Sequence, residues 1–246
     1  MSMQPNRAMV LAAGLGLRMR PLTLTRPKPL VEFAGKTLLD HVLDRLVEAR
    51  IGEAVVNVHY LPDQIIDHVR ARAAPRITIS DERDLLLDTG GGVVKALPLL
   101  GDAPFIHVNS DTVWSENGTP ALRRLVAAFD RERMDMLLLL SAPERSVAFE
   151  GKGDFLLDGD GRLVRRPSDA AVAPAYMGAA LIDPAIFVDA PSGPFSLNLL
   201  FDRAIARSRL FGLLHDGLWM HIGTPEALRE AERRLAASAI AGNDAP

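Results

Sequence analysis

Short apolar segments alternate along the chain with segments whose apolar positions recur at helical spacing. The short segments are typical of β-strands, and they are Ala8–Ala12, Ala54–His59, Arg76–Ser80, Phe105–Val108 and Met136–Leu140. Helical spacing covers residues 38–47, the stretch that Pro62 opens, and residues 93–99. Strands that alternate with helices predict an α/β fold, in which helices cover both faces of a doubly wound, mostly parallel sheet.

The pattern changes after Gly153. Short strand-like pieces flank Asp158–Gly161, whose composition favours a hairpin turn, so we expect a small β insertion over the sheet. Two closing helices and a frayed tail are then expected at 197–207, 225–237 and 241–246. No internal repeat or long linker interrupts this order, which predicts a single domain over residues 1–246.

Composition narrows the classes of protein to consider. The chain has 246 residues and is 48% hydrophobic, long enough to bury a large core. It has no cysteine, which excludes disulfides and cysteine-ligated zinc and suits a reducing cytoplasm. The net charge of −3 gives no electrostatic footprint for nucleic acid. No apolar stretch approaches the ~20 residues of a membrane span, so we expect a cytoplasmic protein with neither nucleic acid nor membrane as a partner.

The loop that follows the first predicted strand has the parts of a polyphosphate site. Gly14 and Gly16 can adopt backbone angles that turn consecutive N–H groups toward phosphate oxygens. Arg18 and Lys28 supply positive charge, the first as a planar fork of donors and the second as a compact point charge. A tight strand-to-helix connection is the alternative interpretation of the two glycines.

Two familiar phosphate motifs do not fit this region. The dinucleotide pattern G-x-G-x-x-G needs a third glycine where the chain has Met19. Gly35-Lys36-Thr37 ends like a Walker A loop, but that loop also needs a glycine where Leu30 stands. We therefore interpret Gly35–Thr37 as a turn that opens the next helix.

Asp111 stands just past the carboxyl end of a predicted buried strand, which is where open α/β sheets bind ligands. A carboxylate there can hold Mg²⁺, which neutralises triphosphate charge and aligns the attacking and leaving oxygens. A helix cap or a turn would also explain an aspartate at this position.

The run LAAG-x-G-x-R-M-x-P-L-T, followed by P-K-P-L, extends from Leu11 to Leu30 and resembles the sugar-1-phosphate nucleotidyltransferases. One departure is Leu17, where many members carry Thr or Ser. Within the family the chain is most similar to uridylyltransferases acting on N-acetylmuramate 1-phosphate, because Thr89-Gly90-Gly91-Gly92 precedes VVKALPLLGDAPF and because Gly151–Phe155 recurs in them. The likeness covers nearly the full chain.

The resemblance implies an in-line reaction in which a sugar 1-phosphate attacks the α-phosphorus of UTP, giving a UDP-sugar and pyrophosphate in cell-wall (peptidoglycan) recycling. It implies a nucleotide-binding half over residues 1–142 and a sugar-binding half over residues 143–240. Another nucleotide with a hexose or heptose 1-phosphate or phosphocholine is the alternative within enzymes. A non-catalytic nucleotide-sugar sensor is the alternative outside them. The sequence leaves the oligomeric state open.

The same resemblance assigns roles to particular residues. The catalytic set is Arg18, Lys28 and Asp111. The nucleotide-binding set is Leu11, Ala13, Gly14, Gly16, Asp88, Thr89, Gly90, Gly91 and Asn109. The sugar-binding set is Lys152, Asp154, Tyr176 and Gly178. A solvated loop lysine and a core aromatic remain the alternatives for Lys152 and Tyr176.

The glycines of 89–92 precede the predicted helix 93–99, so their backbone could lie flat against a nucleobase; a helix cap with flexible glycines is the alternative.

His221 departs from the family's pattern. In Trp219–Thr224 it replaces the carboxylate or amide of W-x-D/N-[IV]-G-T, whose side chain is the second metal ligand. It could ligate the metal, hold a metal-bound water, or contact phosphate or sugar while Asp216 or substrate oxygens complete the sphere. A structural histidine is a further alternative. The metals expected at Asp111 and His221 are Mg²⁺ or, because imidazole favours softer ions, Mn²⁺ or Co²⁺.

Overall fold

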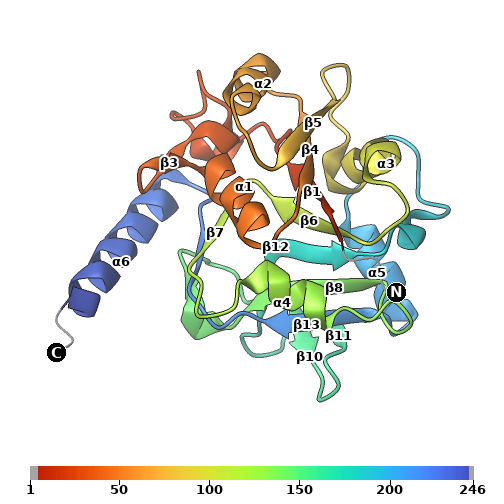
Figure 1. Ribbon diagram of the computed structural model, residues 1–246. Helices are drawn as coiled ribbons and strands as arrows, with labels where there is room; N and C mark the ends of the chain where they lie inside the picture. The colour runs from red at the N-terminus through yellow and green to blue at the C-terminus, as the bar shows by residue number, and fades with distance from the viewer. Residues whose placement is uncertain (1–4, 244–246) are drawn as a thin grey trace.

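A seven-stranded sheet lies at the centre of the computed structural model, which describes residues 5–243 and their side chains through residue 237 (Figure 1). The strand order is β13-β8-β12-β6-β1-β4-β5. Strand β12 runs antiparallel to both neighbours, and the other pairs are parallel. The strands are β1 Arg7–Leu11, β4 Glu53–Val58, β5 Arg76–Asp81, β6 Phe105–Asn109, β8 Met136–Ser141, β12 Ala175–Ile182 and β13 Leu210–Leu214. The predicted doubly wound, mostly parallel sheet is confirmed.

Helices cover both faces of this sheet (Figure 1). One apolar core lies between the sheet and α1 Leu38–Glu48, α2 Pro62–Arg70 and α4 Ala121–Ala128. The opposite core lies under α3 Asp88–Leu100 and α5 Asn198–Ala206. Helix α1 shows why such segments fold: Thr37 caps it by accepting a hydrogen bond from the Asp40 amide at 3.1 Å, and its apolar face is buried.

The segment between β1 and α1 forms two short 3-10 helices and a small hairpin. They are η1 Leu17–Met19, η2 Lys28–Leu30, β2 Glu32–Phe33 and β3 Lys36–Thr37. Gly35 connects β2 to β3 at φ +80°, which favours glycine, and Thr37 then caps α1. The interpretation of Gly35–Thr37 as a turn that opens a helix is confirmed.

A second, three-stranded sheet joins segments that are far apart in the sequence. Strand β14 Trp219–His221 pairs antiparallel with β7 Thr112–Trp114 and parallel with β9 Ser146–Val147. Helix α6, Pro225–Asn243, follows β14 and packs Ala231 into a small apolar cluster with Met19 and Met220. The C-terminal part of the chain therefore supports the loop that follows β1.

The predicted β insertion is present as the hairpin β10 Phe155–Leu157 and β11 Leu163–Arg165, which projects at the bottom of Figure 1. The Asp158 carboxylate closes its turn by accepting hydrogen bonds from the amides of Asp160 and Arg162, at 2.9 and 2.8 Å. Short 3-10 helices η3 Pro143–Arg145 and η4 Pro184–Phe187 complete the fold. Helix α6 is longer than predicted and includes 241–243 of the expected tail; residues 244–246 lie outside the described part. Within that part, no helix combines the length and apolarity that crossing a membrane requires.

Candidate active site

A cavity of about 450 Å³ opens at the carboxyl ends of β1, β4 and β6. In the sheet, β4 lies on one side of β1 and β6 lies on the other. The cavity therefore lies at the point where the direction of strand addition reverses, which is where open α/β sheets bind ligands. Many of the predicted nucleotide and catalytic residues line it: Leu11, Ala13, Gly14, Lys28, Asp88, Thr89, Asn109 and Asp111. The sequence prediction had not included the other residues of its wall: Ala12, Pro29, Asn57, Leu86 and Ser110.

Lys28 and Asp111 form an ion pair at the edge of this cavity. The Lys28 Nζ lies 2.5 Å from Asp111 Oδ2, and the two side chains are only 11% and 29% exposed. Burial raises the pKa of Asp111, but the Lys28 ammonium and the hydrogen bonds that the carboxylate accepts together hold that pKa below its ordinary value. Asp111 is therefore an anion at neutral pH, with one oxygen on Lys28.

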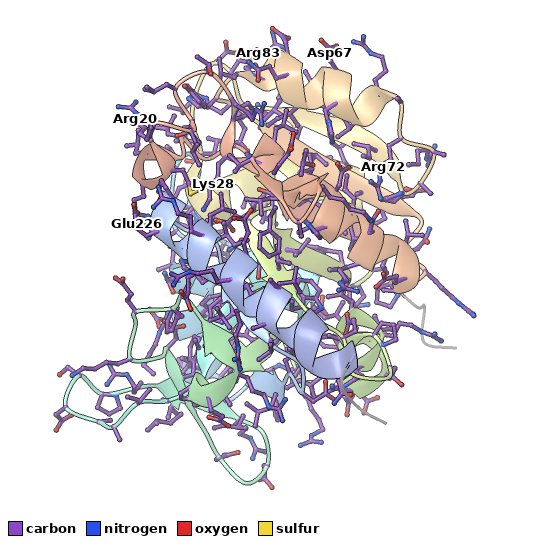
Figure 2. All side chains as sticks on the ribbon, turned by 90° about the vertical axis from the view of Figure 1, so that its left-hand side faces the viewer. Arg20, Lys28, Asp67, Arg72, Arg83 and Glu226 are labelled. Carbon is purple, nitrogen blue, oxygen red and sulfur yellow. The ribbon has the colours of Figure 1, made fainter. Side chains whose placement is uncertain are left out.

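Gly16 and Arg18 do not line this cavity. Gly16 adopts the left-handed conformation (φ 63°), its carbonyl accepts a hydrogen bond from Thr23 Oγ1 at 2.7 Å, and a Cβ on it would lie 3.1 Å from Lys28 Cβ. Gly16 thus shapes the loop that presents Lys28, and its expected contact with the nucleotide stays a prediction. Arg18 lies in an adjoining cavity of about 390 Å³ with His221 and the first turns of α6. Figure 2 shows α6 running across this side of the molecule, with Glu226 in its first turn.

The pairing of β14 with β7 places His221 opposite Thr112, the residue after Asp111. Burial lowers the pKa of His221 below its ordinary value, and the charges of Lys28 and Arg18 lower it further, while Asp111 opposes them. The imidazole is therefore neutral at pH 7 and able to act as a ligand. Asp216, the other candidate for this region, instead pairs with Arg124 of α4 at 2.7 Å.

The glycine-rich segment differs from its prediction. It forms the first turn of α3, and the amides of Gly90 and Gly91 donate to the Phe195 carbonyl at 2.8 and 3.2 Å. A Cβ on Gly90 would lie 2.3 Å from the Phe195 ring. Gly90 and Gly91 pack the loop around Phe195 onto α3, whereas Asp88 and Thr89 line the cavity; the base contact expected of Gly90 and Gly91 stays a prediction.

A buried hydrogen-bond chain that the sequence prediction missed supports both sides of the cavity. The Ala12 amide donates to Asn57 Oδ1, and Asn57 Nδ2 donates to Glu82 Oε1, both at 2.7 Å. Glu82 Oε2 then accepts from the Leu87 amide at 3.1 Å. Asn57, at the carboxyl end of a predicted buried strand, was a usable signal. Glu82 was not, because it stands in the charged run Asp81–Asp84, which resembles a solvated loop.

A third cavity, of about 320 Å³, shares Asp88, Thr89 and Asn109 with the first and extends toward α5. The predicted sugar residues Asp154 and Tyr176 line it. Residues that the sequence prediction missed complete it: His107, Phe155, Arg165, Ser196, Leu197, Asn198 and Phe201.

Hydrogen bonds connect Asp154 to the main chain of Tyr176 and the Tyr176 side chain to His107. Asp154 Oδ2 accepts from the Tyr176 amide at 2.8 Å, and the Tyr176 hydroxyl lies 3.2 Å from His107 Nδ1. Burial raises the pKa of Tyr176 far above its ordinary value, so the phenol stays protonated. Burial lowers the pKa of His107 to about 4, so its imidazole is neutral at pH 7.

Two predicted sugar residues lie elsewhere. Gly178 sits at the register shift of β12 with φ +78°, and a Cβ there would lie 2.7 Å from Asn109 Nδ2. The lack of a side chain at Gly178 thus leaves space for Asn109, and the expected contact of Gly178 with sugar stays a prediction. Lys152 is exposed and does not line the third cavity, and its carbonyl accepts from the Ala173 amide at 2.9 Å.

Comparison with known proteins agrees with this geometry. Residues 7–150 match the nucleotidyl transferase family. An N-acetylmuramate alpha-1-phosphate uridylyltransferase of Caulobacter vibrioides is 51% identical over 241 residues, covering 96% of this chain and 99% of that protein. A protein of the same name from Neisseria meningitidis serogroup B is 34% identical, covering 92% and 96%.

Solved structures share the fold at low sequence identity. A UDP-glucose pyrophosphorylase complexed with UDP-glucose superposes with a TM-score of 0.78 at 15% identity, covering 95% of this chain and 99% of that one. The inositol-1-phosphate CTP transferase from T. maritima gives a TM-score of 0.77 at 17% identity, covering 96% and 97%. The resemblance read from residues 11–30 is confirmed, and the chain belongs to the nucleotidyl transferase family.

Proposed function

We propose that the protein transfers a uridylyl group from UTP to N-acetylmuramate 1-phosphate, releasing UDP-N-acetylmuramate and pyrophosphate. The observation that carries the proposal is the junction of two cavities at Asn109, with the Lys28–Asp111 pair at the edge of the larger one. The name of the 51% identical relative supports the choice of nucleotide and sugar.

The chemistry needs no protein nucleophile, because the attacking sugar phosphate is already an anion. An oxygen of that phosphate attacks the α-phosphorus, and the bond to the bridging oxygen of pyrophosphate breaks in line with it. Lys28, on the wall of the larger cavity, would stabilise the negative charge that develops, and Arg18, in the cavity that His221 lines, would add a second positive charge for phosphate oxygens. Catalysis then comes from positioning and charge neutralisation.

The residues present fit a divalent metal ion that arrives with the triphosphate. Within residues 5–237 no group of three acidic or histidine side chains forms a metal cage, and Mg²⁺ at phosphoryl-transfer sites uses one or two carboxylates together with substrate oxygens. Asp111 would hold such an ion through the oxygen that Lys28 leaves free, with neutral His221 beside it. The ion would neutralise phosphate charge. Mg²⁺ is proposed, with Mn²⁺ and Co²⁺ as alternatives.

The two cavities divide the substrates. We assign the nucleotide to the larger cavity, against Leu11, Ala13, Gly14, Asp88 and Thr89, and the sugar to the smaller one, against Asp154 and Tyr176. Lys152 remains a candidate for the sugar phosphate only if its loop closes on substrate. A cytoplasmic role in reusing cell-wall sugar follows from these substrates, and the absence of cysteine suits that compartment.

A pyrophosphate-release assay tests the proposal. The purified protein is given UTP, CTP, GTP or ATP with a panel of acceptors: N-acetylmuramate, N-acetylglucosamine, glucose, mannose and heptose 1-phosphates, and phosphocholine. We expect the highest kcat/KM with UTP and N-acetylmuramate 1-phosphate. A preference for GTP or for another acceptor would reject the proposed substrates, and no turnover with any pair would favour a sensor.

A further inference from the structure

The cavity of about 320 Å³ to which we assign the sugar, called here the acceptor cavity, contains a positively charged side chain, that of Arg165. The transfer reaction itself does not require this charge. Of the described residues that line this cavity, Arg165 alone is a cation at neutral pH, because His107 is neutral; Asp88 and Asp154 are acidic. Arg165 ends β11 of the hairpin, whereas the reacting phosphate belongs near Lys28 and Asp111, at the edge of the other cavity. The positive charge therefore lies in a different cavity from the Lys28–Asp111 pair.

Neighbouring side chains hold the Arg165 guanidinium in one position. Nε donates to Asp202 Oδ1 at 2.8 Å, and Nη2 donates to the side-chain and main-chain oxygens of Asn198 at 3.0 and 3.2 Å. The guanidinium carbon also lies 4.9 Å from the ring centroid of Phe155 and 5.8 Å from that of Phe201. Such stacking fixes the planar group and reduces the entropy lost when a ligand binds it.

One nitrogen of this group is left for a ligand. Among residues 5–237, Nη1 of Arg165 makes no hydrogen bond, although Nε and Nη2 are both engaged. The side chain is 37% exposed. A guanidinium that is held by its other donors and keeps Nη1 free can donate a charge-assisted hydrogen bond to a carboxylate oxygen.

We propose that Arg165 makes the enzyme selective for acceptors that carry a carboxylate, by binding the lactyl carboxylate of N-acetylmuramate 1-phosphate. The inference rests on the proposed function and extends it to a specificity-determining residue. N-Acetylmuramate differs from N-acetylglucosamine by a lactyl ether that ends in a carboxylate. Burying that carboxylate without a partner would be costly, and the acidic side chains of Asp88 and Asp154 would repel it, so Arg165 is its only cationic partner among the described residues lining the cavity.

Arg162 provides a matched control in the same hairpin. Its guanidinium carbon lies 5.5 Å from the Phe211 ring centroid, and it pairs with Asp160 at 2.6 Å. Arg162 thus shares with Arg165 a cation–π contact and a surface ion pair but does not line the acceptor cavity. Arg162→Gln removes the same charge from the same element without touching the proposed site.

The experiment measures kcat/KM for the wild type, Arg165→Gln, Arg165→Lys and Arg162→Gln with UTP and two acceptors, N-acetylmuramate 1-phosphate and N-acetylglucosamine 1-phosphate. The quantity compared is the ratio of the two kcat/KM values. We expect Arg165→Gln to lower that ratio by about 10- to 100-fold, the size of a lost hydrogen bond to a charged group. The loss should appear mainly in KM for the muramate acceptor. Arg165→Lys should recover part of it, and Arg162→Gln should leave the ratio unchanged.

The outcomes separate this inference from the proposed function. A wild type that uses N-acetylmuramate 1-phosphate, together with an Arg165→Gln variant that loses activity equally on both acceptors or on neither, would overturn the role of Arg165 alone. A wild type that does not use N-acetylmuramate 1-phosphate but uses N-acetylglucosamine 1-phosphate would overturn the proposed function and the inference with it. The KM for UTP and the Tm of each variant identify a loss caused by misfolding.

Discussion

The nucleotide cavity and the acceptor cavity meet at Asn109 but are assembled differently. Most of the first comes from a few contiguous segments at the carboxyl ends of neighbouring parallel strands, with Lys28 and Asp111 facing each other. The second gathers side chains from β6, the hairpin, β12 and α5, which are far apart in the sequence. The difference implies that the transfer chemistry depends on a compact charged unit and that the choice of acceptor depends on how distant elements pack.

The strongest test of this comparison is Asp111→Asn, which removes the anion and keeps the shape. We expect kcat/KM to fall by about 10³-fold, because the metal-binding charge and the partner of Lys28 are lost together. Circular dichroism should show an unchanged fold. Asp216→Asn is the control, since Asp216 pairs with Arg124 instead. Near-normal turnover of Asp111→Asn with Mg²⁺ would remove Asp111 from the site.

The next test compares the two cations of the loop. Lys28→Ala should lower kcat/KM by about 10²- to 10³-fold, because Lys28 is 11% exposed and lines the nucleotide cavity. Arg18→Ala should cost less, since Arg18 is exposed and lies in the adjoining cavity, where water screens its charge. Lys36→Ala, an exposed lysine paired with Asp44, is the control. Equal losses for Lys28 and Arg18 would contradict the division between the two cavities.

His107 tests the floor of the acceptor cavity through the stability of the protein. Its pKa is about 4 when folded and about 6.5 when unfolded, so between these values the unfolded state binds more protons. The contribution of His107 to the free energy of unfolding is therefore at its maximum above pH 6.5. It falls by about 3 kcal/mol as the pH drops to 4. Denaturant unfolding of the wild type and His107→Gln at several pH values should show a shallower pH dependence in the variant. Parallel curves would mean that His107 titrates normally.

Gly90→Val tests the junction between the cavities. Its side chain would collide with the Phe195 ring, so we expect a loss of about 1–3 kcal/mol of stability. The KM for UTP should change only if the substitution moves α3, whose first residues Asp88 and Thr89 line the cavity. Trimming the ring in a Gly90→Val, Phe195→Ala double variant should recover part of the loss, as a double-mutant cycle would measure. A large rise in the KM for UTP at unchanged Tm would instead support the predicted direct contact between Gly90 and the base.

The smallest effect is expected at His221, in the cavity that adjoins the nucleotide site. His221→Asp would place oxygen where neutral imidazole now lies beside Asp111, and oxygen favours Mg²⁺. The ratio of activity with Mn²⁺ to activity with Mg²⁺ should fall by a few-fold. An unchanged ratio, together with full activity of His221→Ala, would place His221 outside the metal site.

Much of the fold could be predicted because its signals are local. The spacing of apolar residues and the length of each segment distinguish strands such as Ala54–His59 from helices such as the one that Pro62 opens. The alternation of strands and helices then implies a parallel sheet. The rule that ligands bind at the carboxyl ends of such strands then places Asp111. The close packing at residues 90–92 could not be predicted, because only the tertiary structure brings Phe195 against Gly90, the Gly193 carbonyl against Gly91, and Glu82 against Gly92.

The order of elements, the loop of Gly14 and Lys28 and the place of Asp111 after a strand could be predicted from residue order alone, since each depends on residues that are neighbours in the chain. The other contacts of the site depend on tertiary packing. The pairing of β14 with β7 places His221 opposite Thr112, the residue after Asp111, and the hairpin packed against α5 brings Arg165 to the acceptor cavity. In the sequence Glu82 stands in a polar run, but in the folded protein its buried carboxylate connects Asn57 and Leu87 by hydrogen bonds. No local period encodes these contacts, because they form only when distant segments exclude water together.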